Sequence, residues 1–260
     1  MPHFAPTAED HAAFERDGYV LARTLFDADE MSALLRYAKG DAAMVADSVV
    51  RADASGGETR LTVRNDIDPG SVYSAIVCSR RVAGAMAELL GDEVYHYHHK
   101  MMLKEPRVGG AWEWHQDYGY WYDNGCLYPD MASCLIAVDE ATRENGCLQV
   151  LRGSHRIGRV NHVQVGAQVG ADPQRVAWAS QKHELVHCEM RPGDALFFHS
   201  NLLHRSDKNE SERPRWSLIC CYNTRHNDPF VRDGRHPNYS PLEIWDDERV
   251  RERLLGQVTS

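Results

Sequence analysis

The sequence predicts a mainly β domain, a sandwich or barrel, with a helical layer at its N-terminal end. Two observations predict this fold class. After Gly91 the chain breaks into short apolar or alternating runs, separated by turn signals such as Asn145-Gly146 and Pro192-Gly193, which is the pattern of all-β sandwiches and barrels. Before Gly91, apolar residues recur at helical spacing instead. The runs that we expect to form strands are 94–103, 132–138, 147–151, 183–188, 195–199 and 216–222.

The N-terminal part contains three stretches with helical signals. The first, 9–17, ends at Gly18 and is followed by a short strand-like run over 19–21. The second begins at Asp27, which has Glu30 three residues later as in a capping box, and ends at Gly40. The third spans 71–90 and ends at Gly91.

Between the second and third helical stretches, Ser48–Gly70 is polar and rich in glycine. Such a composition buries little apolar surface, so we expect a loop. We expect it to act as a mobile lid that becomes ordered when a ligand binds in the mouth of the barrel.

The chain of 260 residues is long enough for one large β domain, and it contains no internal repeat or low-complexity linker. We therefore expect one domain over 1–260. Its helix-rich part spans about 1–92, its β core about 93–225, and a C-terminal extension about 226–260.

Charge and composition exclude several classes of protein. A formal net charge of -9 argues against nucleic-acid binding, which needs a concentrated basic surface. No apolar run approaches the roughly eighteen residues that cross a membrane, and the first residues do not resemble a secretory signal. The seven cysteines are odd in number and form no C-x-x-C pair. We therefore expect a reduced, cytoplasmic protein with no nucleic-acid or membrane partner, and the oligomeric state stays open.

The segment Trp114-His115-Gln116-Asp117 contains a His-x-Asp motif. On a strand, the side chains of His115 and Asp117 would point to the same face. One imidazole and one carboxylate are two of the three protein ligands in the facial triad of non-haem iron(II). The third ligand would be a histidine from a distant strand, and the segment 197–209 offers two candidates, His199 and His204.

Four blocks in the sequence resemble the phytanoyl-CoA dioxygenase family. In order and spacing they cover most of the chain. The blocks are Phe14–Val20, Leu103–Pro106 followed by Trp114–Asp117, Glu144–His155, and His204–Asn209 followed by Arg215.

The resemblance implies a double-stranded β-helix, also called a jelly roll and similar to the cupin fold, that binds iron(II) in the mouth of its barrel. It implies His115, Asp117 and His204 as iron ligands, because Ser206 and Asn209 follow His204 at the spacing found in the family. His199 would then be a core residue of a strand. The implied reaction uses 2-oxoglutarate and O2 to hydroxylate an unactivated C–H bond of a small-molecule metabolite, and it releases succinate and CO2.

The resemblance also implies a site for 2-oxoglutarate. Arg215 lies where the family has the arginine that pairs with the far carboxylate, and a planar guanidinium suits such a pair. Ser206 matches a hydroxyl donor to the same group, and Ser217 lies on the strand face of Arg215. Met102 stands where some relatives have an asparagine that contacts the co-substrate. We therefore expect Arg60 or Arg64 to contact the C1 carboxylate.

The substrate-binding residues that we expect are Arg64, His98, Tyr118 and Tyr120. Of the histidines around His98, we expect His96 to share its strand face and His99 to lie on the other. The aromatic run 118–122 follows the iron ligands directly, so part of it is expected to line the substrate pocket and part to lie in the core. For His155, both a hydrogen-bonded turn residue and a functional residue stay open.

Two other functions use the same residues. A zinc hydrolase with the same three ligands is chemically possible, but it would leave Arg215 and Ser206 without a purpose. The second is a non-catalytic jelly-roll binding protein with a relict metal site, which an intact triad disfavours. Asp117 also disfavours a halogenase, because those relatives have a small residue at that position. The sequence shows no basic groove for the phosphates of coenzyme A, so we expect a small free metabolite as substrate.

Overall fold

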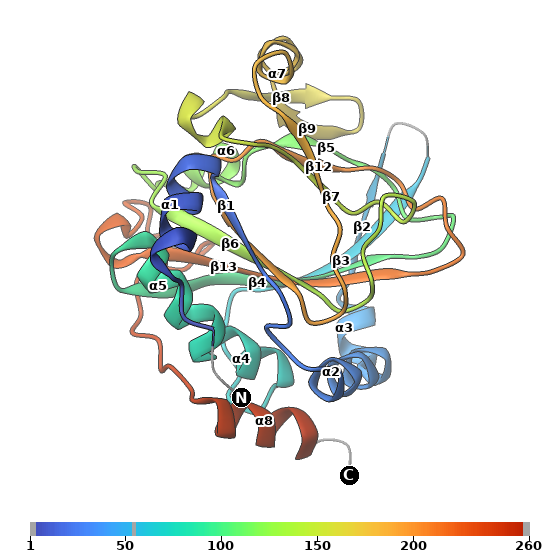
Figure 1. The fold of residues 1–260 in the computed structure, drawn as a ribbon, viewed down its shortest axis with the longest axis vertical. Coiled ribbons are helices and arrows are strands. Elements are labelled where there is room, and N and C mark those ends of the chain that lie inside the picture. Colours follow the sequence, from blue (N-terminus) through green and yellow to red (C-terminus); the bar gives the residue numbers. More distant parts are fainter. Residues whose placement is uncertain (1–3, 54–55, 257–260) are drawn as a thin grey trace.

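The computed structural model describes residues 4–53 and 56–256. Two antiparallel sheets face each other, and a small hairpin lies at one end (Figure 1). The large sheet has the order β1 (Tyr19–Ala22), β11 (Ala195–His199), β6 (Met131–Ala137), β13 (Arg215–Thr224), β4 (Val94–Lys104), β3 (Glu58–Arg64) and β2 (Val49–Ala52). The small sheet has the order β10 (Leu185–Cys188), β7 (Leu148–Leu151), β12 (His204–Ser206) and β5 (Trp112–His115). The hairpin pairs β8 (His162–Val165) with β9 (Gln168–Ala171).

Side-chain alternation along the strands divides the core into two layers. On β13, Leu218 and Cys220 face the helices, whereas Ile219 and Cys221 face the space between the two sheets. The central strands of the large sheet, such as β13, β6 and β11, are therefore apolar on both faces. This explains why their sequences are nearly continuous apolar runs.

Helices cover the outer face of the large sheet (Figure 1). The capping box of Asp27 and Glu30 is formed as predicted, and Gly91 ends the third helical stretch in the left-handed conformation. The helices of this layer are α1 (Ala8–Asp17), α2 (Ala28–Gly40), α3 (Ala42–Ala46), α4 (Val72–Val77), a π-helix η1 (Arg80–Gly84), α5 (Ala85–Leu90) and α8 (Asp247–Gly256). The remaining helices are α6 (Asp117–Trp121), α7 (Pro173–Ser180) and the 3-10 turns η2 (Tyr122–Asn124), η3 (Ser154–Ile157) and η4 (Arg225–Asn227). Within the described residues, no helix is long and apolar enough to span a membrane.

The loop predicted over Ser48–Gly70 is wrong for the part that forms two strands, Val49–Ala52 and Glu58–Arg64. β2 and β3 form an antiparallel hairpin, and β3 pairs with β4 from Arg60 to Arg64. Ala54 and Ser55 at its tip lie outside the described residues. The hairpin extends the large sheet at its edge, where one strand face packs against the protein and the other stays polar. That ligand binding orders this segment stays a prediction.

A bulge in β4 changes the predicted faces of its histidines. Cys221 of β13 lies opposite His98, but the next residue of β13, Tyr222, lies opposite His96, so Tyr97 is the extra residue. Because of this shift, His96 lies near His99, with Nε2 of His96 3.0 Å from Nδ1 of His99. The prediction that His96 shares the face of His98 is therefore wrong.

Candidate active site

Three buried side chains meet between the two sheets at one end of the interior. Nε2 of His115 lies 4.0 Å from Oδ1 of Asp117, and Nε2 of His204 lies 3.9 Å from the same oxygen. The three ligand atoms all lie within 4.8 Å of one another. His115 ends β5 and lies opposite His204 at the start of β12, so the pairing of these two strands brings the imidazoles together. His199 is not part of this group and accepts a hydrogen bond from the backbone N–H of Asn201.

Asp117 reaches the group in a way that the strand pattern did not predict. β5 ends at His115, and Asp117 is the first residue of the short helix α6. The carboxylate therefore turns toward the histidines at a strand-to-helix junction rather than along one strand face. The predicted set of three residues is brought together, but the predicted strand geometry is wrong for Asp117.

Hydrogen bonds fix the orientation of each ligand. Nδ1 of His115 lies 2.7 Å from the carbonyl oxygen of Glu113, and Nδ1 of His204 lies 2.9 Å from that of Leu202. A carbonyl oxygen only accepts, so both Nδ1 atoms carry a proton and both Nε2 lone pairs face the centre of the group. The hydroxyl of Ser133 donates to Oδ2 of Asp117 at 2.7 Å.

The protonation states of these residues suit a metal dication. Burial lowers the pKa of His115 and of His204, which keeps both imidazoles neutral. For Asp117, burial opposes ionisation, but the charge of Lys100 and the hydrogen bond from Ser133 contribute to a pKa below the usual value. Two neutral imidazoles and one carboxylate are the ligand set of non-haem iron(II). The residues present therefore fit the predicted iron.

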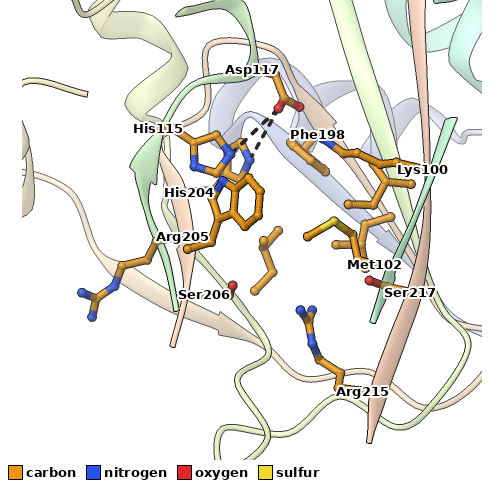
Figure 2. Close-up of a pocket in the computed structure, with 14 residues that line it drawn as sticks. Lys100, Met102, His115, Asp117, Phe198, His204, Arg205, Ser206, Arg215 and Ser217 are labelled. Carbon is orange, nitrogen blue, oxygen red and sulfur yellow. Dashed lines mark ion pairs between the residues drawn. The ribbon is translucent and has the colours of Figure 1, made fainter. Parts of the chain in front are cut away.

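A pocket extends from the triad toward Arg215, which points into it from the opposite end (Figure 2). β4, β12 and β13 supply Met102, Ser206, Arg215 and Ser217 to its wall. Arg215 is only 3% exposed, and burial lowers its pKa to about 10, within the range where it keeps its charge at neutral pH.

Several polar atoms of this pocket have no partner within the described part of the chain. Nε of Arg215 and Oγ of Ser217 are buried without a hydrogen bond, and Arg215 makes no ion pair there. A buried charge without a partner is costly, so the pocket suits an anion. An acid with one carboxylate at Arg215 and a second at the triad matches this arrangement.

Lys104 lies next to the arginine end of the pocket. Its ammonium donates to Oγ of Ser206 at 2.8 Å and to the backbone carbonyl of Asp207. Burial and the charge of Arg215 lower its pKa well below the usual value. Lys104 therefore holds the hydroxyl of Ser206 in place beside the anion pocket.

Comparison with known proteins places this site in a family. The sequence model described as phytanoyl-CoA dioxygenase matches residues 14–217. The chain belongs to this family. The match includes all three residues of the triad and Arg215.

Relatives with similar sequences include a hydroxylase and a dioxygenase. The chain is 28% identical over 257 residues to the L-proline trans-4-hydroxylase of Streptomyces griseoviridis, covering 92% of this chain and 93% of that enzyme. It is 29% identical over 241 residues to the ectoine dioxygenase of Sphingopyxis alaskensis, covering 85% and 77%. Both alignments extend over most of the two chains that they compare.

Solved structures of an enzyme of this kind are also similar to this chain. EctD from S. alaskensis with bound Fe has a TM-score of 0.78 at 26% identity, covering 95% of this chain and 90% of that chain. The same enzyme with 2-oxoglutarate and 5-hydroxyectoine has a TM-score of 0.76 over the same shares. The predictions of the family, of the jelly-roll fold and of an oxygenase are confirmed.

Two of the residues predicted to bind substrate do not reach the pocket. Arg64 follows Thr62 on the outer face of β3, where Thr62 donates to the carbonyl of Met44 and Arg64 pairs with Asp47 at 2.7 Å. Arg60 lies on the same face of β3 as Thr62 and Arg64, so neither arginine faces the interior. The hydroxyl of Tyr118 donates to the carbonyl of Cys126 at 3.1 Å, and its ring lies in the core. These structural contacts correct the predicted substrate roles of Arg64 and Tyr118.

The other two residues predicted to bind substrate, Tyr120 and His98, lie closer to the triad. The ring of Tyr120 lies 5.8 Å from that of His115, and its hydroxyl donates to the carbonyl of Val169. His98 lies on the inner side of β4, 5.8 Å from the ring of Trp121. Their roles in substrate binding stay predictions. Nε2 of His155 lies 3.1 Å from the carbonyl oxygen of Glu15, and its ring packs against His199. These contacts agree with the first of the two alternatives, a hydrogen-bonded turn residue.

The sequence reasoning missed Lys100, Lys104 and Ser133. Lys100, Met102 and Lys104 alternate along the inward face of β4, and Lys100 lines the pocket beside the triad. Two lysines at this spacing in a buried strand were a usable signal, because a charged residue on a buried strand face needs a partner. Ser133 gave no such signal, because a serine in a buried strand is common.

Proposed function

We propose that this protein is an iron(II)- and 2-oxoglutarate-dependent dioxygenase that hydroxylates a C–H bond of a small metabolite. One observation carries the proposal. A His-Asp-His triad with both Nε2 lone pairs facing inward shares a pocket with a buried arginine that has no partner among the described residues.

Each part of the pocket has a role in this reaction. His115, Asp117 and His204 would bind the iron, which supplies the activation of O2. Arg215 would pair with the far carboxylate of 2-oxoglutarate, and the hydroxyls of Ser206 and Ser217 would donate to it. The products are succinate, CO2 and the hydroxylated substrate, so each turnover consumes one molecule of 2-oxoglutarate and one of O2.

The relatives support a small polar substrate. The names of the two relatives above refer to L-proline and ectoine, which are both small cyclic amino acids. We infer that the substrate of this enzyme has a similar size and polarity. The seven cysteines are all free and buried, which supports the prediction of a reducing, cytoplasmic location.

The two other functions explain fewer features. A zinc hydrolase needs only the triad, and it leaves the buried Arg215 and the hydroxyl of Ser217 without a ligand. A relict binding protein would not need the two backbone hydrogen bonds that fix both imidazoles for a metal. Both alternatives predict that 2-oxoglutarate is not consumed.

The test begins under anaerobic conditions with iron(II) and 2-oxoglutarate. Chelation of the metal by a 2-oxo acid produces a visible charge-transfer absorption, which would be absent for a zinc hydrolase. After O2 is admitted, succinate release is measured across a metabolite panel that includes L-proline and ectoine. An iron(II)-loaded enzyme that shows no charge-transfer absorption with 2-oxoglutarate and forms no succinate would overturn the proposal.

A further inference from the structure

Lys100 places a positive charge beside the triad that the reaction described above does not use. It lies on the inward face of β4 and lines the same pocket as His115, Asp117 and His204 (Figure 2). Its charge contributes to the lowered pKa of Asp117, and it adds a smaller effect to the burial that lowers the pKa of both histidines. The ammonium of Lys100 therefore lies within electrostatic reach of the metal position.

Within the described part of the chain, the ammonium of Lys100 has no partner. Among residues 4–53 and 56–256 it makes no hydrogen bond and no ion pair, whereas the buried Lys104 on the same face donates to two oxygens. The closest carboxylate in the pocket is Asp117, whose oxygens serve the metal position and Ser133. A half-buried ammonium without a partner in an apolar pocket is unfavourable unless an anion binds there.

The charges of the site with iron and 2-oxoglutarate bound also indicate that a further anion binds at Lys100. An iron dication, the Asp117 carboxylate and a doubly negative 2-oxoglutarate leave one negative charge, which Arg215 balances. Lys104 lies at the arginine end of the pocket, where its amine already donates to Ser206 and to the carbonyl of Asp207. The ammonium of Lys100 then remains in excess, so the site with iron and co-substrate bound still attracts one negative charge.

A second cation lies on the same side of the protein. Arg51 of β2 is opposite Thr59 of β3, so the two side chains lie on the same face of the sheet. Leu61 lies on this face too, because it is two residues from Thr59, and it packs into the inner core. Its charge acts on the phenol of Tyr120, which packs against His115. Arg51 is exposed, so it adds positive potential on the solvent side of Tyr120 and favours an anionic ligand.

We propose that Lys100 binds the carboxylate of the primary substrate and thereby restricts the enzyme to small carboxylic or amino acids. The inference rests on the proposed function and names the substrate class of the same site. Lys100 holds the acid by a charge-assisted hydrogen bond and positions its carbon skeleton against the metal. The C1 carboxylate of 2-oxoglutarate is the other carboxylate that could reach this ammonium, and the experiment separates the two.

The experiment uses acetate as the simplest carboxylate probe. The enzyme is loaded anaerobically with cobalt(II) and saturating 2-oxoglutarate, and the paramagnetic relaxation of carbon-13 acetate is measured as acetate is titrated. The wild type is expected to show saturable binding close to the metal. Lys100→Met should weaken it at least about tenfold, the scale of one charge-assisted hydrogen bond, and Lys100→Arg should retain it. Lys182→Met, which removes an exposed lysine, is the matched control and should bind acetate like the wild type.

A second measurement separates the substrate from the co-substrate. The affinity for 2-oxoglutarate is read from the charge-transfer absorption of the iron(II) enzyme, and Lys100→Met should change it by less than about threefold. A large loss of 2-oxoglutarate affinity with unchanged acetate binding assigns Lys100 to the co-substrate and overturns the proposal. Equal acetate binding by the wild type and Lys100→Met, or no saturable binding at all, also overturns it. A wild type that shows no charge-transfer absorption contradicts the proposed function itself.

Discussion

The hydroxyl of Ser133 donates a hydrogen bond of 2.7 Å to Oδ2 of Asp117, while Oδ1 of the same carboxylate lies 3.9 Å from Nε2 of His204. Ser133 is fully buried on β6, so this bond holds the carboxylate with one oxygen directed at the metal position. We expect Ser133→Ala to weaken metal binding about ten- to a hundredfold, as for other groups that orient a ligand. Isothermal titration with cobalt(II) measures this.

Ser180→Ala is the matched control for this prediction. Ser180 donates its hydroxyl to the carbonyl of Val176 within α7 and takes no part in the triad, whereas Ser133 contacts Asp117 and the thiol of Cys221. Its metal affinity should equal that of the wild type. If both variants bind cobalt equally well, the bond to Asp117 does not orient the ligand.

The choice between the two distal histidines is tested directly. His204→Ala removes one of three metal ligands and should abolish stoichiometric iron binding and succinate formation. His199→Ala removes a half-buried ring that packs against Phe14 and His155, so it should lower thermal stability and leave iron binding intact. Iron content after gel filtration, measured with the melting temperature, separates the two effects. Retained iron in His204→Ala would show that the triad is assigned wrongly.

Arg215 is expected to determine the affinity for 2-oxoglutarate and not for iron. Replacing its buried guanidinium with glutamine should cost about 2–5 kcal/mol of co-substrate binding, because the bound carboxylate loses its charged partner. The 2-oxoglutarate requirement of succinate formation should rise accordingly, while cobalt affinity without co-substrate stays the same. Arg213→Gln removes an exposed arginine two residues earlier, paired with Glu140, and serves as the control. An unchanged requirement in Arg215→Gln would refute the assignment.

Much of this site could be predicted because short motifs keep chemically defined residues at fixed spacing. His115 and Asp117 are two residues apart, so any turn or strand brings them close together. The strands of the large sheet were also predictable, because both of their faces are buried and apolar. β2 and β3 were not, because an edge hairpin packs on one face only and its polar composition resembles that of a loop.

The residues that face the pocket were harder to predict than the ligands. One extra residue reverses the faces of a strand, and the bulge at Tyr97 does this to His96. The face on which Arg64 lies could not be predicted, because its segment was expected to be a loop and is a strand. The spacing of Lys100 and Lys104 indicates that they share a strand face, but only the fold shows that this face is the inward one. Sequence reasoning therefore identified the metal ligands and missed a cation beside them.

The histidine pair on the outer face of β4 predicts how the protein responds to acid. Burial lowers the pKa of His96 to about 4 and that of His99 to about 3, both below the roughly 6.5 of an unfolded chain. The unfolded chain therefore binds protons that the folded state excludes. Stability is fully present above about pH 6.5 and is lost as the pH falls toward the folded values, by up to about 1.4 kcal/mol per pH unit for each group.

Urea unfolding of the metal-free protein at pH 7.5 and 5.5 tests this dependence. The double variant His96→Gln with His99→Gln should lose less stability between these pH values than the wild type. His226→Gln is the control, because hydrogen bonds from His226 to Asp92 and Asp130 raise its pKa and give it the opposite sign. It should lose more stability in acid than the wild type does. Identical losses in the wild type and the double variant would contradict the prediction.

The last prediction concerns closure of the β2–β3 hairpin over the pocket. β3 lies between β2 and β4, and its Leu61, Thr59 and Thr62 are buried, so its amides should exchange slowly even without ligands. β2 is the edge strand of the sheet, its four residues are exposed, and it carries Arg51 on the side of the triad. Asp53 links the hairpin to the strand before the triad, because its Oδ2 accepts from the backbone N–H of Ala111 at 2.7 Å.

Hydrogen exchange is measured anaerobically with iron(II), with and without 2-oxoglutarate and a carboxylic acid. We expect added protection over residues 49–53, little change in β3, and none in α8 on the far side of the large sheet. Protection in β2 that is the same in every condition would show that the hairpin is a fixed wall of the pocket and does not close.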